Sequence, residues 1–217
     1  MKVEIWSDVV CPWCYIGKRR FETALSRFDA AADVEVIWRS FQLNPEQPRG
    51  ARQSHDEYLR TKVGGSLEQV EAMNVRVTAL AAAEGLDYHF ERYQVINTFD
   101  AHRVAHLGRV SGLGEEIQER LLRGQLVEGE VLDDPDTLVR LGAEVGLAGD
   151  EIRDVLATDR FAAEVAADMR EAGELGITGV PFFVVDRRYG ISGAQPPDVL
   201  LQALTMAREE AMAATGG

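Results

Sequence analysis

The sequence predicts an α/β fold in which helices cover both faces of a mixed sheet and a large α-helical segment interrupts the sheet-forming chain. Strand-like segments occur only near the two ends, at residues 3–6, 34–38 and 181–186, whereas residues 53–159 carry helical patterns alone. The outer pieces follow the order β, α, β and then α, β, β, α. That order is typical of a sheet with helices on both faces.

The first part of the chain predicts a strand, a helix and a second strand. Residues 3–6 alternate apolar and polar side chains, as a short strand does. A helix begins near two cysteines, with Pro12 in the first turn, where its missing N–H costs nothing. The helix has an apolar stripe of Tyr15, Ile16, Phe21, Leu25 and Phe28, with Lys18, Arg19 and Glu22 facing outward. Residues 34–38 form the next strand, and a right-handed crossover makes the two strands parallel.

The middle of the chain predicts a series of helices. Ser66 and Gln69 have the spacing of a capping box, which opens a helix with Leu67, Val70, Val77 and Leu80 inward. Further helices are expected from Thr98 to Gly112, from Glu115 to Gly124, from Asp134-Pro135 to Gly146, and from Glu151 to Ala157. No strand pattern occurs in this stretch, so we interpret it as a helical insertion.

The last part of the chain returns to sheet-forming patterns. A helix over residues 160–175 precedes a strand over 181–186, which turns at 187–190 into a partner strand at 191–193. Pro196-Pro197 opens a final helix, and Gly216-Gly217 is expected to fray. The predicted organisation is a thioredoxin-like domain built from residues 1–47 and 159–217, with an inserted helical domain over residues 48–158.

The composition excludes some partners. The 217 residues carry a formal net charge of −13, which repels a phosphate backbone, so no nucleic-acid partner is expected. No apolar run approaches the roughly 18 residues that a membrane span needs, so no membrane partner is expected either. Asp8 and Cys11 interrupt the first apolar stretch too early for a secretory signal. We therefore expect a cytoplasmic protein, in which a permanent structural disulfide would be unusual.

The two cysteines of the chain form the sequence Cys11-Pro12-Trp13-Cys14. The positive end of the following helix favours a thiolate at Cys11, and Cys14 lies one helical step away, where it can resolve a mixed disulfide. Pro12 and Trp13 carry no charge, so a moderate oxidising power is expected. The alternatives are two packed core cysteines or a zinc half-site, and tetrahedral zinc would need further ligands that no second C-x-x-C supplies. The spacing favours redox chemistry.

The dipeptide Val180-Pro181 precedes the third predicted strand. An ordinary trans proline at the first residue of a strand is one interpretation. The other is a cis peptide bond that lies beside the cysteines and exposes the backbone of Val180 to an extended peptide. The order of elements around Cys11 and Cys14 favours the cis interpretation.

Four motifs resemble the DsbA-like superfamily of the thioredoxin fold, and most closely the cytoplasmic FrnE-type oxidoreductases. They are Trp6-Ser7-Asp8-Val9-Val10-Cys11-Pro12-Trp13-Cys14-Tyr15-Ile16-Gly17, Phe41-Gln42-Leu43-Asn44-Pro45, Asn97-Thr98-Phe99-Asp100-Ala101-His102-Arg103 and Gly176-Ile177-Thr178-Gly179-Val180-Pro181-Phe182-Phe183. The resemblance covers essentially the whole chain. It implies an inserted helical domain, a cis Pro181, and nucleophilic and resolving roles for Cys11 and Cys14. Some relatives carry a second cysteine pair near the C-terminus, which this chain lacks.

The resemblance also implies that Asn97 and His102 face the cleft between the two domains, where they would line the substrate site together with Pro12, Trp13, Val180 and Pro181. His102 and His106 lie four residues apart on one helical face, but no third ligand is visible nearby, so no metal is expected. The alternative for these histidines is a structural role, either packed between the domains or exposed to solvent. Asp8 either tunes the nearby thiol or caps a turn.

Three functions remain open. The first is a protein disulfide oxidoreductase that needs no resident cofactor, with a thiol or disulfide-containing protein or small molecule as partner and glutathione as a candidate co-substrate. The second is a glutathione-dependent isomerase or transferase acting on an aromatic or polyketide-like molecule, because the superfamily includes 2-hydroxychromene-2-carboxylate isomerases and kappa-class glutathione transferases. Those relatives typically place serine at the position of Cys11. The third is a chaperone-like binder, and the chain is expected to be a monomer or a homodimer.

Overall fold

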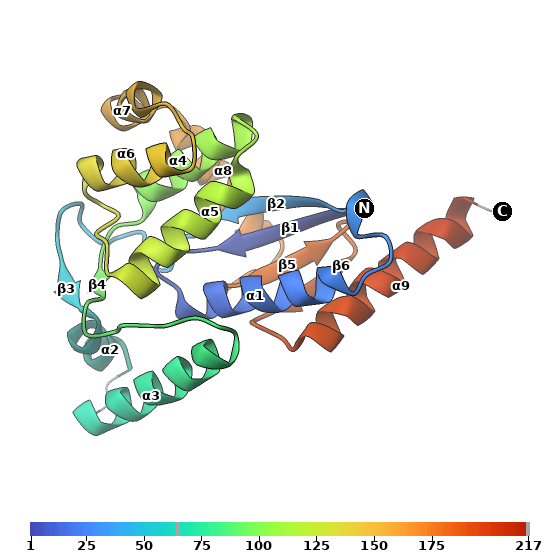
Figure 1. Ribbon diagram of the computed structural model, residues 1–217, viewed down its shortest axis with the longest axis horizontal. Helices are drawn as coiled ribbons and strands as arrows, with labels where there is room; N and C mark the ends of the chain where they lie inside the picture. The colour runs from blue at the N-terminus through green and yellow to red at the C-terminus, as the bar shows by residue number, and fades with distance from the viewer. Residues whose placement is uncertain (64–65, 216–217) are drawn as a thin grey trace.

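A four-stranded sheet lies at the centre of the computed structural model, which describes residues 1–63 and 66–215 (Figure 1). Residues 64–65 and the Gly216-Gly217 tail lie outside the described part. The strand order is β2-β1-β5-β6, from the strands β1 (Lys2–Ser7), β2 (Glu35–Ser40), β5 (Phe182–Val185) and β6 (Tyr189–Ser192). Strands β1 and β2 are parallel, as predicted. Strand β5 is antiparallel to both β1 and β6, and β5 and β6 form the expected hairpin.

Helices cover both faces of this sheet. Helices α1 (Pro12–Ser26) and α9 (Pro197–Thr215) pack together on one face, and α8 (Ala162–Glu174) contacts the other beside β2 (Figure 1). The side chains of β1 divide between two apolar clusters: Val3 and Ile5 pack with residues of α1 and α9, and Trp6 packs with Ala172 of α8. This division follows from the two-residue repeat of a strand. The predicted α/β architecture is confirmed.

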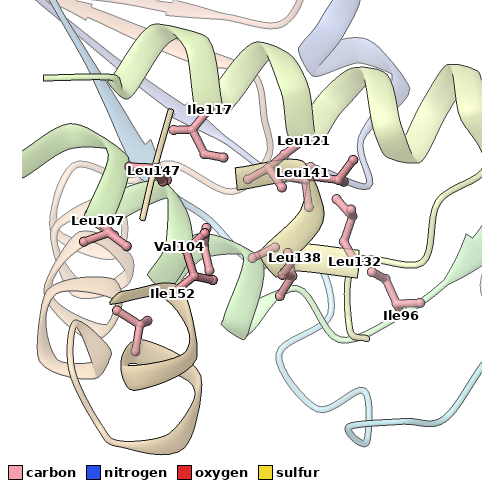
Figure 2. Close-up of a cluster of buried hydrophobic side chains, with 13 residues drawn as sticks. Ile96, Val104, Leu107, Ile117, Leu121, Leu132, Leu138, Leu141, Leu147 and Ile152 are labelled. Atoms are coloured by element: carbon pink, nitrogen blue, oxygen red, sulfur yellow. The ribbon is translucent and has the colours of Figure 1, made fainter. Parts of the chain in front are cut away.

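The chain between β2 and α8 is mainly helical. It contains α2 (His55–Val63), α3 (Leu67–Ala83), α4 (Phe99–Val110), α5 (Gly114–Arg123), α6 (Pro135–Glu144) and α7 (Gly149–Ala157). Helices α4 to α7 enclose an apolar core of their own, and Figure 2 shows its largest side chains turned toward one another. They include Ile96, Val104, Leu107, Ile117, Leu121, Leu132, Leu138, Leu141, Leu147 and Ile152. We call this segment the helical insertion.

Two features of the insertion differ from the sequence prediction. The strands β3 (Gln53–Ser54) and β4 (Gln94–Val95) form an antiparallel pair where no strand was expected. Two residues are too few to show an alternating pattern, so the pair escapes detection. The helix expected to stop at Gly124 instead continues as a π-helical turn, Gly124–Glu128, and ends at Gly129 with φ of 73°. Glycine adopts this left-handed conformation without a steric penalty.

The predicted helix starts are largely confirmed. Ser66 and Gln69 make both hydrogen bonds of a capping box, and the Asp134 side chain caps α6 by accepting from the Thr137 N–H at 2.9 Å. Thr98 precedes α4 without a side-chain cap. Leu67 was expected to face inward but is 58% exposed, because it lies at the edge of the helix face that Val70 and Val77 define.

Lys18 is a second residue, after Leu67, whose predicted orientation was wrong. The helical pattern places it on the outer face of α1, but only 2% of the residue is exposed. Helix α5 of the insertion packs beside that face, and the Lys18 ammonium lies among carboxylates of Glu22, Glu115 and Glu119. A position that is outward for an isolated sheet domain is therefore an internal contact here. None of the helices within residues 1–63 and 66–215 combines the length and the apolar character that a membrane crossing requires.

Candidate active site

The two cysteines lie at the start of α1, at the end of the sheet that faces the insertion. Cys11 is the residue before the helix and has an extended backbone, with φ of −92° and ψ of 112°. Pro12 occupies the first turn, and the Cys14 N–H donates to the Cys11 carbonyl at 3.0 Å. The Cys11 side chain thus stands at the positive end of a helix dipole, which stabilises a thiolate.

The two thiols have different surroundings. Both are free and buried, with 4% of Cys11 and 1% of Cys14 exposed, whereas the neighbouring Trp13 is 39% exposed. Burial raises the pKa of the Cys14 thiol well above its ordinary value, and its hydrogen bond to Cys11 raises it further. Cys14 therefore remains a thiol, and a hydrogen bond from a thiol stabilises a thiolate at Cys11. The arrangement suits attack by Cys11 and a later step at Cys14.

The segment before β5 lies against Cys11. The Val180–Pro181 peptide bond is cis, and the Cys11 Sγ donates to the Val180 carbonyl oxygen at 3.5 Å. Pro181 is buried against α1, where a Cβ added at Gly17 would lie 2.8 Å from the Pro181 Cγ. Gly17 therefore allows the close approach of α1 to this loop. Residues that are distant in sequence, Cys11 and Val180, meet at one point.

Asp8 lies beneath the loop that carries Cys11 and is fully buried. Its Oδ2 accepts from the Leu43 N–H at 2.8 Å, and its Oδ1 lies 3.3 Å from the His102 Nε2. The same His102 nitrogen lies 3.1 Å from the Phe41 carbonyl oxygen. A nitrogen between two acceptors must carry the proton, so His102 donates through Nε2. Asp8 and His102 thus join the sheet to α4 of the insertion.

Asn97, also expected at the substrate site, has its amide engaged by the backbone. Its Nδ2 donates to the Gln47 carbonyl, and its Oδ1 accepts from the Phe99 N–H at 2.9 Å. These bonds hold the chain as it enters α4. His106, one turn beyond His102, lies 3.1 Å from the Asp168 carboxylate and the same distance from the Ser40 hydroxyl. In the described part of the chain, no group of three His, Cys, Asp or Glu residues has the arrangement of a metal site.

Two tyrosines of the insertion contact the loop that carries Cys11, and the sequence analysis did not identify them as site residues. Tyr88 Oη donates to the Pro12 carbonyl at 2.7 Å, and Tyr93 Oη donates to the Val10 carbonyl. Burial raises the pKa of both phenols, and negative charge at Cys11 raises it further. Both tyrosines therefore remain protonated donors. They lie in a loop with no periodic pattern, so nothing in the sequence marks them.

A small cavity opens beside Pro12, between the active-site loop and the insertion. Its volume is about 120 Å³, and its walls are mainly apolar. They include Val10, Pro12, Leu43, Tyr58, Tyr93 and Ile96. A larger cavity of about 460 Å³ lies along β2, with His102, His106 and Gln118 in its walls. The first cavity adjoins the loop that carries Cys11. In the walls of the second, His102 contacts Asp8 and Gln118 contacts Ser7, two residues that precede this loop.

Comparison with known proteins agrees with this fold. Residues 2–205 match the family of DSBA-like thioredoxin domains, so the chain belongs to that family. Its structure is similar to that of a probable DsbA oxidoreductase from Streptomyces coelicolor. The sequences are 47% identical, the TM-score is 0.94, and the match covers 97% of this chain and 91% of the other.

Two more distant structures share the fold. One is a cytosolic disulfide reductase from Pseudomonas aeruginosa with GSH, at 21% identity and a TM-score of 0.67, covering 96% of this chain and all of the other. The second is a 2-hydroxychromene-2-carboxylate isomerase, at 14% identity and a TM-score of 0.70, covering both chains fully. The predicted superfamily and its thioredoxin-like fold are thus confirmed, and the chain is an oxidoreductase of the DsbA-like family.

Proposed function

We propose that this chain is a thiol–disulfide oxidoreductase whose reaction centre is Cys11-Pro12-Trp13-Cys14. The observation that carries the proposal is the position of Cys11. Its sulfur stands at the N-terminus of α1, beside the buried Cys14 thiol, and 3.5 Å from the Val180 carbonyl oxygen. A nucleophile, a resolving thiol and a backbone edge for an extended substrate meet at this point.

The reaction proceeds by two thiol–disulfide exchanges. The Cys11 thiolate attacks a substrate disulfide, a bond forms between the two sulfurs, and the other substrate sulfur leaves as a thiolate. Cys14 then attacks the Cys11 sulfur, a Cys11–Cys14 disulfide forms, and the second substrate sulfur departs with the Cys14 proton. The substrate is reduced by two electrons and the protein is oxidised by two. The reverse sequence oxidises a substrate dithiol.

The surroundings of Cys11 support a substrate that lies across the loop. Trp13 is exposed beside the cysteines, and the cavity beside Pro12 has mainly apolar walls. We place the substrate, a disulfide- or thiol-containing protein or small molecule, against Pro12, Trp13, Val180 and Pro181, with Asn97 and His102 supporting the insertion side. Glutathione is a candidate co-substrate, since the structurally similar reductase from Pseudomonas aeruginosa was solved with GSH. The reducing cytoplasm is the proposed location.

The test compares two single substitutions in reduction of a protein disulfide and in oxidative refolding. Cys11→Ser is expected to abolish turnover, because it removes the nucleophile. Cys14→Ser is expected to accumulate a mixed disulfide at Cys11, detected by mass spectrometry of the intact protein. Full turnover by Cys11→Ser would contradict the proposal. A Cys14→Ser variant that keeps full activity toward a glutathione-dependent isomerisation would favour the isomerase instead.

A further inference from the structure

Strand β2 forms one edge of the central sheet, because it pairs with β1 alone (Figure 1). The Glu35 N–H at its start donates to the Met1 carbonyl at 2.9 Å. In a ladder, every second residue turns its N–H and C=O groups toward the same neighbouring strand. Glu35 and the other odd-numbered residues of β2 therefore face β1, whereas the backbone groups of Val36, Trp38 and Ser40 point away from the sheet.

The end of this edge is bonded and its middle is free. The Ser40 N–H donates to the Asp168 Oδ2 at 2.9 Å, which agrees with its outward direction. Within residues 1–63 and 66–215, no group hydrogen-bonds to the backbone N–H or C=O of Val36 or Trp38. Two donors and two acceptors are thus free on the outer side of β2. An unpaired edge of this kind is a template for a further strand.

The cavity of about 460 Å³ runs along this edge. All six residues of β2 lie in its wall. Because alternate side chains of a strand point to opposite faces of a sheet, a cavity that borders consecutive residues lies at the edge rather than over one face. Helices α4 and α5 form the opposite wall and straddle the edge: His106 of α4 lies against Asp168 of α8, and Glu115 of α5 pairs with Lys18 of α1. We call this space between β2, α4 and α5 the β2 groove.

His106 in the groove wall has a hydrogen-bonding atom without a partner. Its Nε2 lies 3.1 Å from the Asp168 carboxylate, so in the neutral ring this nitrogen carries the proton and Nδ1 is an acceptor. The residue is 4% exposed, and no donor in the described part of the chain reaches Nδ1. Buried polar atoms are hydrogen-bonded in the great majority of cases. A donor on a molecule that occupies the groove would satisfy this nitrogen.

The groove also contains an unpaired positive charge. The Glu35, Arg39 and Glu115 side chains in its wall all belong to ion pairs. Arg109, in the last turn of α4, forms no ion pair with any residue that the structure describes. Salt screens the acidic residues of the chain that lie beyond about 8 Å at physiological ionic strength. The local charge of the groove therefore favours an anionic group.

We propose that the β2 groove binds an extended segment of a partner protein, which pairs with β2 as an added strand and places an acidic side chain near Arg109. The free donors and acceptors of Val36 and Trp38 match an extended backbone, which offers N–H and carbonyl groups at the same spacing. A second copy of this chain does not fit in the same way, because its own β2 lies behind its own α4 and α5. Cys11 and Cys14 are not in the groove wall, so the inference goes beyond the proposed function and does not depend on it.

The test uses the acetylated and amidated peptide Thr-Val-Thr-Glu-Thr-Val-Thr, which alternates like a strand, carries one carboxylate and has no cysteine. In an NMR titration of the whole chain labelled with nitrogen-15, the peptide should bind with a Kd below about 1 mM. The largest amide shifts should fall on β2, and hydrogen exchange should slow at Val36 and Trp38, because their N–H groups gain acceptors. A peptide with methyl groups on its central nitrogens cannot donate to the edge and should bind at least about tenfold more weakly.

Val36→Pro removes one outward N–H and leaves the bonds between β1 and β2 intact, since proline is tolerated at a sheet edge where its missing N–H faces outward. It should weaken binding about fivefold, as expected for the loss of one hydrogen bond. Val36→Ala is the matched control, because it shortens the same side chain, keeps the N–H and should bind as wild type does. Arg109→Gln should weaken binding about threefold. It should not change the affinity for a peptide that has glutamine in place of glutamate.

An absence of binding at about 5 mM peptide would overturn the inference, and so would equal affinities of the methylated and unmethylated peptides. Shifts centred on Trp13 would place the peptide at the cysteines and overturn it as well. A wild-type dimer in light scattering that Val36→Pro dissociates would assign the edge to a second copy instead. If Val36→Pro does not fold, the methylated peptide and Arg109→Gln decide the outcome. A wild-type protein that binds the peptide at β2 but exchanges no disulfide would refute the proposed function and leave the β2 groove standing.

Discussion

The interior of the helical insertion is apolar, whereas its contact with the sheet domain combines an apolar cluster with buried polar pairs. The interior is an apolar cluster that includes Ile117 and Leu121. At the contact, by comparison, Lys18 lies among carboxylates, Gln118 bonds to Ser7, and His102 lies against Asp8. Apolar burial is non-directional, whereas buried polar pairs require one geometry. The difference teaches that apolar burial stabilises the insertion and that polar pairs orient it on the active site.

The largest effect is expected from the apolar interior. Leu121→Ala removes a fully buried side chain of α5 and leaves a cavity, so the free energy of unfolding should fall by about 2–5 kcal/mol. Urea denaturation monitored by circular dichroism measures this change. Val110→Ala on α4, at a residue 61% exposed, is the control and should cost less than about 0.5 kcal/mol. Equal losses in the two variants would contradict the role assigned to the apolar core.

An intermediate loss of stability is expected at the polar contact between α1 and the insertion. Lys18→Met keeps an apolar stem of similar length but leaves Glu22, Glu115 and Glu119 without their shared ammonium. Since these carboxylates are partly exposed, the free energy of unfolding at pH 7 should fall by about 1–3 kcal/mol, below the cost of breaking a fully buried pair. The control is Lys2→Met, because Lys2 forms an exposed pair with Glu35 at 3.6 Å and should contribute less than about 1 kcal/mol.

The loss of stability in Lys18→Met should depend on pH. Burial of Glu119 would raise its pKa, but hydrogen bonds from Tyr15 and Lys18 outweigh burial and hold the pKa below its ordinary value of 4.5. A lowered pKa in the folded state stabilises the protein above the unfolded pKa, and this contribution is lost as pH falls through the folded pKa. The stability difference between wild type and Lys18→Met should therefore shrink below about pH 4.5. A difference that stays constant from pH 7 to pH 3 would argue against a charged contact.

The smallest loss of stability is expected where a single hydrogen bond joins the insertion to the loop that carries Cys11. Tyr88→Phe removes the donor to the Pro12 carbonyl but keeps the buried ring, so unfolding should become easier by about 1 kcal/mol. Tyr189→Phe is the control, since the Tyr189 hydroxyl pairs with Glu210 at the surface. Thermal denaturation should separate the two variants. If both behave like wild type, Tyr88 contributes packing alone.

Much of the architecture was predictable because its signals are local. Alternation marks β1, Ser66 and Asp134 mark helix starts, and the two-residue spacing of Cys11 and Cys14 indicates redox chemistry. The errors lie where local signals are weak or are overridden. Strands β3 and β4 are too short to show a period, and Lys18 is buried by a helix about a hundred residues later in the chain.

By itself, the sequence determined the α/β class, the mainly helical character of the insertion and the position of the two cysteines of the proposed reaction centre at the start of α1. Each of these follows from the repeat of a strand or helix, or from residues a few positions apart. Only the tertiary structure decided which groups lie around the loop that carries the cysteines: the Val180 carbonyl at Cys11, Gln118 at Ser7, and Tyr88 on the Pro12 carbonyl. The contacts of Val180, Gln118 and Tyr88 join segments far apart in the sequence, so they exist only after the insertion has packed and β5 has paired with β1.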